Sequence, residues 1–175
     1  MRNTLLALSI LAFSAPAFAG DDRMLHVEES VSIAAPASTV WNKANNFGDL
    51  GAWHPAVKST EITAGENGKK GAVRLLTLQD GGTIKEKLLG YDNRKMSFKY
   101  AILEGVLPVS DYTSTVTVEA DSATSSTVTW KGTFKRKDVS ATPAAGQDDE
   151  TATKTITAVY RGGLDNLKKI LESKQ

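Results

Sequence analysis

Six consecutive segments with the alternating pattern of β-strands occupy the middle of the chain, and they constrain its fold more than any other feature. Within each segment apolar residues alternate with polar ones, as in a strand with one buried face. Only short turns separate the segments, for example Asp80-Gly81-Gly82, a typical hairpin sequence. Strands joined by such short links run antiparallel. The predicted strands are residues 57–64, 72–79, 83–91, 95–103, 110–120 and 125–137.

A further strand and two short helices precede these six segments. Residues 25–33 alternate in the same way and predict the first strand. Pro36 ends that strand and suits the first turn of a helix that runs to about Asn45. A second short helical turn, followed by a loop, is expected within residues 46–55.

A long amphipathic helix is predicted after an exposed loop at residues 138–147. Acidic residues 148–150 stand at its start and Lys168 and Lys169 near its end, and both placements complement the helix dipole. This helix is the only element able to cover the open face of the sheet, so the sequence predicts an α+β fold. A single helix cannot fill a wide concave face, and the space left over is a natural ligand site. The apolar residues at helical spacing are Ile156, Val159, Tyr160, Leu164, Leu167, Ile170 and Leu171.

The first nineteen residues have the pattern of a signal peptide. Arg2 gives a positive start, Leu5 to Phe13 form a short apolar run, and Ala17-Phe18-Ala19 is a small-x-small cleavage site. We expect cleavage near Ala19-Gly20, a periplasmic protein, and one domain over residues 20–175. The alternative, an N-terminal membrane anchor, is disfavoured by the shortness of the run. No later segment is apolar enough to span a membrane, so no integral membrane segment is expected in the mature chain.

Composition excludes several classes of function. The chain has no cysteine, which rules out disulfides, thiolate metal sites and a cysteine nucleophile. Its 21 basic and 20 acidic residues form no basic block, which argues against nucleic acid as a partner. Two histidines, His26 and His54, stand too far apart to form a metal-ligand motif. No nucleotide-binding or hydrolase motif occurs, so neither a metal nor a cofactor is expected.

Several short motifs stand out along the chain: Ala35-Pro36, Val40-Trp41, Trp53-His54-Pro55, Glu86-Lys87-Leu88, Tyr91-Asp92, Trp130, Tyr160 and Gly163-Leu164. Together they resemble the START-like, Bet v 1-like superfamily (SRPBCC), within it the polyketide cyclase/dehydrase and lipid-transport group. An exported member of this size is similar to the periplasmic methanol-oxidation accessory (MxaD-like) proteins. The resemblance implies a helix-grip fold, in which a curved seven-stranded antiparallel sheet surrounds a C-terminal helix, with two short helices after the first strand.

The plant abscisic-acid receptors share this fold, and some stretches are similar to theirs. Lys58, Glu86 and Tyr112 match residues that line the receptor cavity, and residues 79–83 and 105–109 match the entrance loops. The receptors' gate motif is absent, so binding of that hormone is not implied. Only the plan of the cavity carries over, with Gly81, Gly82, Leu107 and Pro108 as the entrance residues.

Strand alternation and the resemblance together single out Lys58 and Glu86. Lys58 shares a face with Ile62, and Glu86 shares one with Ile84 and Leu88. If these faces point inward, Lys58 could anchor a ligand carboxylate or carbonyl, with Glu86 as its partner. The alternatives are an exposed Lys58, because lysine is rarely buried unless it is paired, and a structural ion pair of Glu86 with Lys58 or Arg74.

Aromatic residues on the inner faces are candidates either for the core or for the cavity. Tyr100, Tyr112 and Ser114 carry polar atoms that need partners when they are buried, which favours a cavity role for them. Gly162-Gly163 interrupts the long helix, and we interpret the pair as a place where a ligand or the sheet approaches closely. The predicted ligand-binding residues are Lys58, Leu76, Leu78, Ile84, Glu86, Leu88, Tyr100, Ile102, Tyr112, Ser114, Trp130, Val159, Tyr160 and Gly163.

Three functions remain open on the sequence. The first is binding of an apolar small molecule, such as a lipid-, quinone- or polyketide-like compound. The second is an accessory role in which the protein docks onto a periplasmic dehydrogenase or cytochrome. The third is a cyclase or dehydratase that uses Glu86, Tyr112 or His54, although a histidine beside a tryptophan is more often structural.

Overall fold

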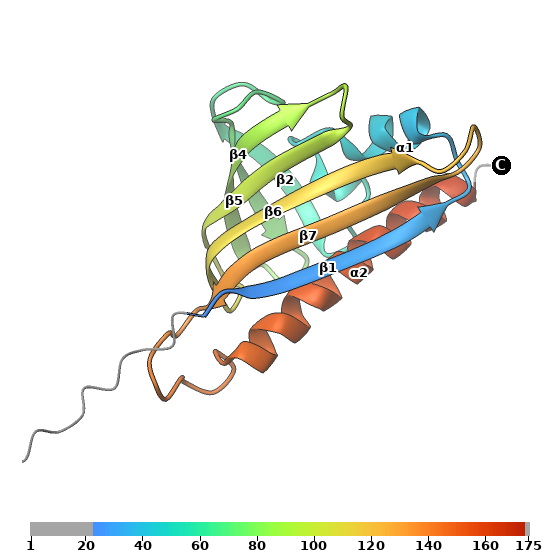
Figure 1. Ribbon diagram of the computed structural model, residues 1–175. Coiled ribbons are helices and arrows are strands. Elements are labelled where there is room, and N and C mark those ends of the chain that lie inside the picture. Colours follow the sequence, from blue (N-terminus) through green and yellow to red (C-terminus); the bar gives the residue numbers. More distant parts are fainter. Residues whose placement is uncertain (1–22, 174–175) are drawn as a thin grey trace, which may run out of the picture.

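A computed structural model describes residues 23–173 and shows a curved antiparallel sheet that wraps around one long helix (Figure 1). The predicted signal peptide lies outside the described residues. The sheet has seven strands in the order β1-β7-β6-β5-β4-β3-β2, with every neighbouring pair antiparallel. The predicted helix-grip architecture is therefore confirmed. The strands are β1 Leu25–Ile33, β2 Val57–Ala64, β3 Val73–Leu78, β4 Thr83–Asp92, β5 Ser97–Gly105, β6 Val109–Ala120 and β7 Ser126–Arg136.

Two short helical elements connect β1 to β2, as predicted. Helix α1 covers Ala37–Ala44 and buries its apolar side, which includes Val40 and Trp41. The second element, η1 at Leu50–Ala52, is a single 3-10 turn. It delivers Trp53 and His54 to the interior, where both are buried.

The C-terminal helix α2, Asp149–Glu172, lies along the concave side of the sheet (Figure 1). Asp148 caps its first turn, since the carboxylate accepts hydrogen bonds from the backbone N–H and the hydroxyl of Thr151. The buried side of the helix carries Ile156, Tyr160, Leu164 and Leu167, as the spacing predicted. None of the helices within residues 23–173 is long and apolar enough to cross a membrane.

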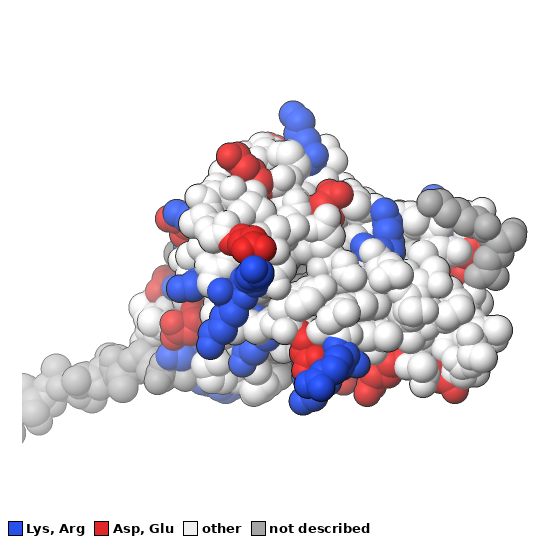
Figure 2. Space-filling model, turned by 90° about the horizontal axis from the view of Figure 1, so that it is seen from above, with Lys and Arg blue, Asp and Glu red and all other residues white. Residues whose placement is uncertain are grey.

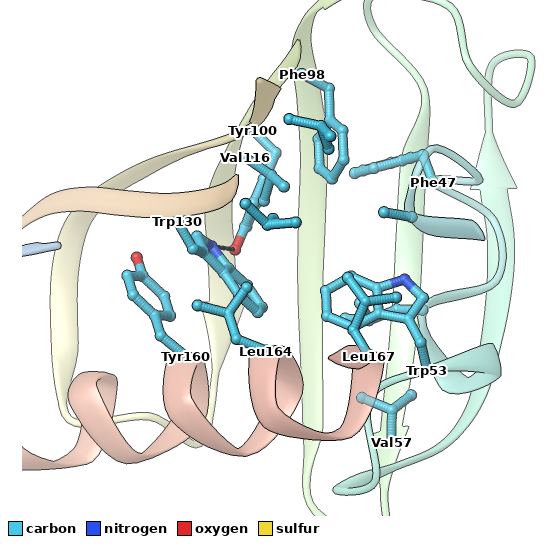
Figure 3. Close-up of a cluster of buried hydrophobic side chains, with 14 of the residues drawn as sticks. Phe47, Trp53, Val57, Phe98, Tyr100, Val116, Trp130, Tyr160, Leu164 and Leu167 are labelled. Atoms are coloured by element: carbon cyan, nitrogen blue, oxygen red, sulfur yellow. Dashed lines mark hydrogen bonds between the residues drawn. The ribbon is translucent and has the colours of Figure 1, made fainter. Parts of the chain in front are cut away.

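Aromatic side chains fill most of the space between sheet and helix. The rings of Trp130 on β7 and Tyr160 on α2 stack with centroids 4.5 Å apart and planes 11° apart, and Trp53 packs edge-on against Trp130. Phe47 and Phe98 form a second group toward α1 (Figure 3). The concave face is therefore largely a packed core, and any ligand site is confined to what these rings leave open.

Candidate functional site

A small apolar cavity remains between η1, α2 and the middle strands of the sheet. Its volume is about 60 Å³. The side chains around it are almost all apolar or aromatic, and the exceptions are His54, Glu86, and the hydroxyl groups of Tyr100 and Tyr112. The lining residues are Leu50, His54, Ala56, Val57, Leu76, Leu78, Ile84, Glu86, Tyr100, Ile102, Leu107, Tyr112, Trp130, Ile156 and Val159.

A buried ion pair borders the cavity. Glu86 on β4 accepts a hydrogen bond from Arg74 Nε on β3, 2.6 Å from its Oε2, and both side chains are at most 5% exposed. The guanidinium group also donates to the carbonyl oxygen of Phe47 at 2.8 Å and lies 4.1 Å from the centroid of the Phe47 ring. Burial raises the pKa of the Glu86 carboxyl, and Arg74 opposes part of that rise. The structural ion pair with Arg74, one of the two alternatives left open by the sequence, is the arrangement found.

The hydroxyl group of Ser114 anchors a buried hydrogen-bond network behind the cavity. It donates to the carbonyl oxygen of Lys131 at 2.9 Å, so its remaining contacts are acceptor contacts. Trp130 Nε1 donates to it at 2.9 Å and also to the Tyr100 hydroxyl at 3.1 Å. The hydroxyl group of Tyr160 must donate to Ser114 across their 2.9 Å contact.

The direction of the remaining bonds follows from that anchor. Because Tyr160 donates to Ser114, the Tyr112 hydroxyl donates to Tyr160 at 2.5 Å, and Tyr100 donates to Tyr112 at 3.4 Å. Burial raises the pKa values of Tyr100 and Tyr112 well above their usual range, and it raises the pKa of Tyr160 to about 12. Every hydroxyl hydrogen of the network is therefore used by a protein acceptor, and none is left for a ligand.

His54 is also fully engaged by the protein. Its Nε2 lies 3.0 Å from the carbonyl oxygen of Val159, and its Nδ1 accepts the backbone N–H of Ala56 at 3.3 Å. These partners assign the hydrogen to Nε2 in a neutral ring. Burial is the main cause that lowers the pKa of this imidazole. The residue joins η1 to α2, which agrees with the structural interpretation of its sequence context.

Gly163 marks the close approach that the sequence predicted. A Cβ atom at this position would lie 2.6 Å from Cδ2 of His54 and 2.9 Å from Cζ3 of Trp130. A Cβ on Gly162 would have no atom within 4 Å, so the prediction holds for the second glycine alone. What approaches the helix at Gly163 is the protein's own aromatic cluster.

The predicted inward orientation of Lys58 is wrong. The pairing of β2 with β3 is irregular between Val57 and Ser59, so one residue drops out of the alternation there. Val57 is buried and Thr60 lies opposite Leu76, whereas Lys58 is exposed. It cannot pair with Glu86 from the solvent side, and the cavity has no lysine.

The other predicted residues divide between the cavity wall and the core behind it. The cavity is lined by Leu107 of the predicted entrance and by eight further predicted residues: Leu76, Leu78, Ile84, Tyr100, Ile102, Tyr112, Trp130 and Val159. Four other predicted residues are buried but do not line the cavity: Leu88, Ser114, Tyr160 and Gly163. Three predicted entrance residues do not line it either: Gly81, Gly82 and Pro108.

Four lining residues were not predicted: Leu50, Ala56, Val57 and Ile156. Ile156 could have been found, because it shares a helix face with Val159 and Tyr160. Leu50 and Ala56 belong to the irregular segment around η1, where no periodicity indicates an inner face. Val57 is the first residue of β2 and lies just before the bulge, so alternation from Ile62 placed it on the outer face. Within the described residues, no group of three or more histidine, aspartate or glutamate side chains could hold a metal ion.

The model of the family described as polyketide cyclase/dehydrase and lipid transport matches residues 24–172. The chain belongs to this family. No curated protein sequence matches the chain.

Solved structures of other proteins share the fold of this member of the polyketide cyclase/dehydrase and lipid-transport family. The protein XoxI from Bacillus cereus is 29% identical with a TM-score of 0.75, and the alignment covers 85% of this chain and 96% of that one. An uncharacterised protein from Bacillus thuringiensis is 31% identical with a TM-score of 0.73 over 85% and 99% of the chains. Ara h 8.0201 is 20% identical with a TM-score of 0.67 over 86% and 99%, which shows a shared fold.

Proposed function

We propose that the protein binds an apolar small molecule in the cavity between the sheet and α2, and that it does so in the periplasm after export. The observation that carries the proposal is the chemistry of the cavity wall. Apolar and aromatic side chains make up nearly all of it, and its few polar groups already have protein partners. A family described by lipid transport as well as cyclase chemistry supports the same conclusion.

The ligand must be largely uncharged where it contacts the cavity. Among residues 23–173 no lysine or arginine side chain lines the cavity, and Arg74, which binds the lining residue Glu86, is already neutralised by it. A ligand carboxylate would therefore meet no free positive charge and would have to lose its hydration, which is unfavourable. Lipid-, quinone- or polyketide-like rings and chains fit this wall better than acids do.

The cavity must widen when a ligand binds. A volume of about 60 Å³ is smaller than the ~150 Å³ apolar cavity that accommodates benzene in an engineered core. Leu78, Ile102, Leu107 and Val159 are only partly buried, whereas the other large aliphatic residues of the lining are buried. We expect this partly exposed side of the wall to move.

A filled cavity provides the test. Val159→Phe places a larger side chain in a cavity of about 60 Å³ and should abolish binding of the apolar dye N-phenyl-1-naphthylamine. Val31→Phe is the matched control, since Val31 is another partly buried valine that does not line the cavity. Equal dye affinity in all three proteins would contradict the proposal, and so would a wild type that binds no dye.

A second candidate is the accessory role, docking onto a periplasmic dehydrogenase or cytochrome. One observation favours it: a docking protein needs no cavity, and this interior is nearly full. On the face shown in Figure 2, acidic and basic side chains are interspersed, so no single-sign patch marks a docking surface there. Affinity capture from the periplasm with Val159→Phe tests this role, because docking without a ligand predicts that the variant recovers the same redox protein as the wild type.

The cyclase or dehydratase hypothesis is less well supported. Glu86, Tyr112 and His54 would be its acid–base groups, and each is bound to another protein group at 3.0 Å or less. Such contacts favour structural roles over proton transfer to a substrate.

A further inference from the structure

The sheet divides where β5 and β6 approach their connecting loop. Their pairing ends at Ala101 opposite Thr113, although β5 continues to Gly105 and β6 already begins at Val109. The register of β6 against β7 also shifts between Ser110 and Thr113, and Asp111 in this bulge has a positive φ of 48°. The bulge draws β6 away from β5, so the two strands separate inside one hairpin.

A hollow of about 700 Å³ lies at this separation on the outer side of the sheet. Its wall is formed by β5, β6, Leu107 of their connecting loop and Lys137. A hollow of this size is within the range of about 300–1,000 Å³ that small-molecule sites occupy.

Three residues line both this outer hollow and the inner cavity: Ile102, Leu107 and Tyr112. Where two strands pair, their backbones separate the two faces of the sheet. The separated ends of β5 and β6 do not pair with each other. At this point only the side chains of these three residues separate the inner cavity from the outer hollow. We call this gap, closed by Ile102, Leu107 and Tyr112, the β5–β6 window.

The frame around the window is fixed. The backbone N–H of Val106 donates to the carbonyl oxygen of Thr83, and the N–H of Lys137 donates to that of Pro108, so the loop is tied to the strands on both sides. The side chain of Val106 lies against Gly82, where a Cβ would be 3.0 Å from its Cγ2. With this frame held in place, we expect opening to come mainly from rotation of the side chains of Ile102 and Leu107, which are partly buried.

We propose that the β5–β6 window is the access route to the cavity and that the outer hollow is the second half of the ligand site. This inference rests on the proposed function. The ligand it implies is elongated and amphipathic, with an apolar part inside the sheet and a polar end in the hollow.

The polar end carries a hydrogen-bond acceptor and no positive charge, because the carboxylates beside the hollow already have cationic partners. Glu104 pairs with Lys85 at 3.3 Å and Asp111 pairs with Lys135 at 3.0 Å, whereas Lys137 Nζ donates to the carbonyl oxygen of Gly105 at 3.0 Å and keeps its charge. A hydroxyl or carbonyl oxygen can accept a hydrogen bond from Lys137, whereas a cation would have to compete for carboxylates that are already paired.

The absence of cysteine from the chain allows a selective test. Glu104→Cys, labelled with pyrenyl maleimide, places a bulky group at the hollow, and Glu119→Cys carries the same label near the other end of β6. Glu104 and Glu119 are both exposed, so neither substitution disturbs the core. The probe is prodan, an uncharged naphthalene with a carbonyl group, and stopped-flow fluorescence measures its association and dissociation rates.

We expect the label on the Glu104→Cys variant to slow both rates about tenfold, which corresponds to about 1.4 kcal/mol in the barrier. The label on the Glu119→Cys variant should change neither rate, and Leu107→Ala, which thins the partition, should raise both. If prodan binds, Val159→Phe abolishes its binding, and the two labelled variants exchange it equally fast, the window is not the route although the binding function stands. If prodan does not bind the wild type, both proposals are wrong.

Discussion

The Arg74–Glu86 pair should show a strong asymmetry between its two halves. Glu86→Leu leaves a guanidinium group buried with a backbone carbonyl as its main remaining hydrogen-bond partner, and arginine cannot lose its proton. We expect this change to lower the free energy of unfolding by about 3–5 kcal/mol, the usual effect of removing one partner of a buried ion pair. The pKa of Glu86 in the wild type is raised, so the wild type loses stability as pH rises above about 4.3, the pKa of unfolded glutamate. Glu86→Leu removes this titration, so its loss relative to wild type should shrink as pH rises.

Arg74→Met should behave differently, because the carboxyl that it leaves behind can take up a proton. Burial already raises the pKa of Glu86, and removal of the guanidinium group raises it further. Unfolded glutamate titrates at about 4.3, so above that pH the folded variant binds more protons than the unfolded one. The stability of the variant therefore falls as pH rises from about 4.3 to the pKa of Glu86 in the folded variant.

Urea unfolding at about pH 5 and about pH 8 measures both effects. The stability difference from wild type should grow from the lower to the higher pH for Arg74→Met and shrink for Glu86→Leu. Taking differences from wild type cancels the contributions of other groups that the change leaves unaffected. The double variant should lose less than the sum of the single changes. A Glu86→Leu loss below about 1 kcal/mol, the level of an exposed pair, would refute the buried pair as described.

Four further substitutions test the packing, and thermal or urea unfolding measures the effect of each on stability. Gly163→Ala should destabilise the protein by about 1–3 kcal/mol, because the new methyl group collides with His54 and Trp130. Gly162→Ala has open space around its methyl group and should stabilise the protein by about 0.5–1 kcal/mol. Equal effects of the two substitutions would contradict the close approach at Gly163. Tyr112→Phe removes the donor to Tyr160 and should cost about 1–3 kcal/mol, whereas a neutral result would mean that the hydroxyl network does not stabilise the core. Lys58→Ala should stay within about 0.5 kcal/mol of wild type and leave dye affinity unchanged, and a loss of affinity would restore the lysine as a ligand contact.

The strand alternation was enough to place most inner faces correctly. Glu86, Tyr100, Tyr112 and Trp130 all point inward as their neighbours on each strand predicted. Alternation failed at Lys58 because a bulge changes the face of every residue on one side of it, and nothing in the residue types around Lys58 marks the bulge.

The size of the cavity could not be predicted from the sequence. Helix and strand periodicities show which residues face inward, but not how their volumes meet across the core. Trp130 on β7 and Tyr160 on α2 stand 30 positions apart in the chain, and only their stacking shows that they fill the space expected for a ligand. For the same reason the tyrosine hydroxyls, expected to face a ligand, satisfy one another.

The partner of Glu86 illustrates the same limit. The sequence left Lys58 and Arg74 as alternatives, because alternation does not show which residues of different strands lie opposite each other. The register of β3 and β4, which sets Arg74 opposite Glu86, decides between them.

Native mass spectrometry of the protein purified from the cells that produce it, followed by solvent extraction, tests whether this cavity holds a ligand. Wild type and Val159→Phe should be purified in parallel from the same cells. We expect wild type to carry an extractable apolar compound of defined mass and the filled-cavity variant to carry none. A wild type without any bound compound, or the same compound in both proteins, would contradict binding in this cavity.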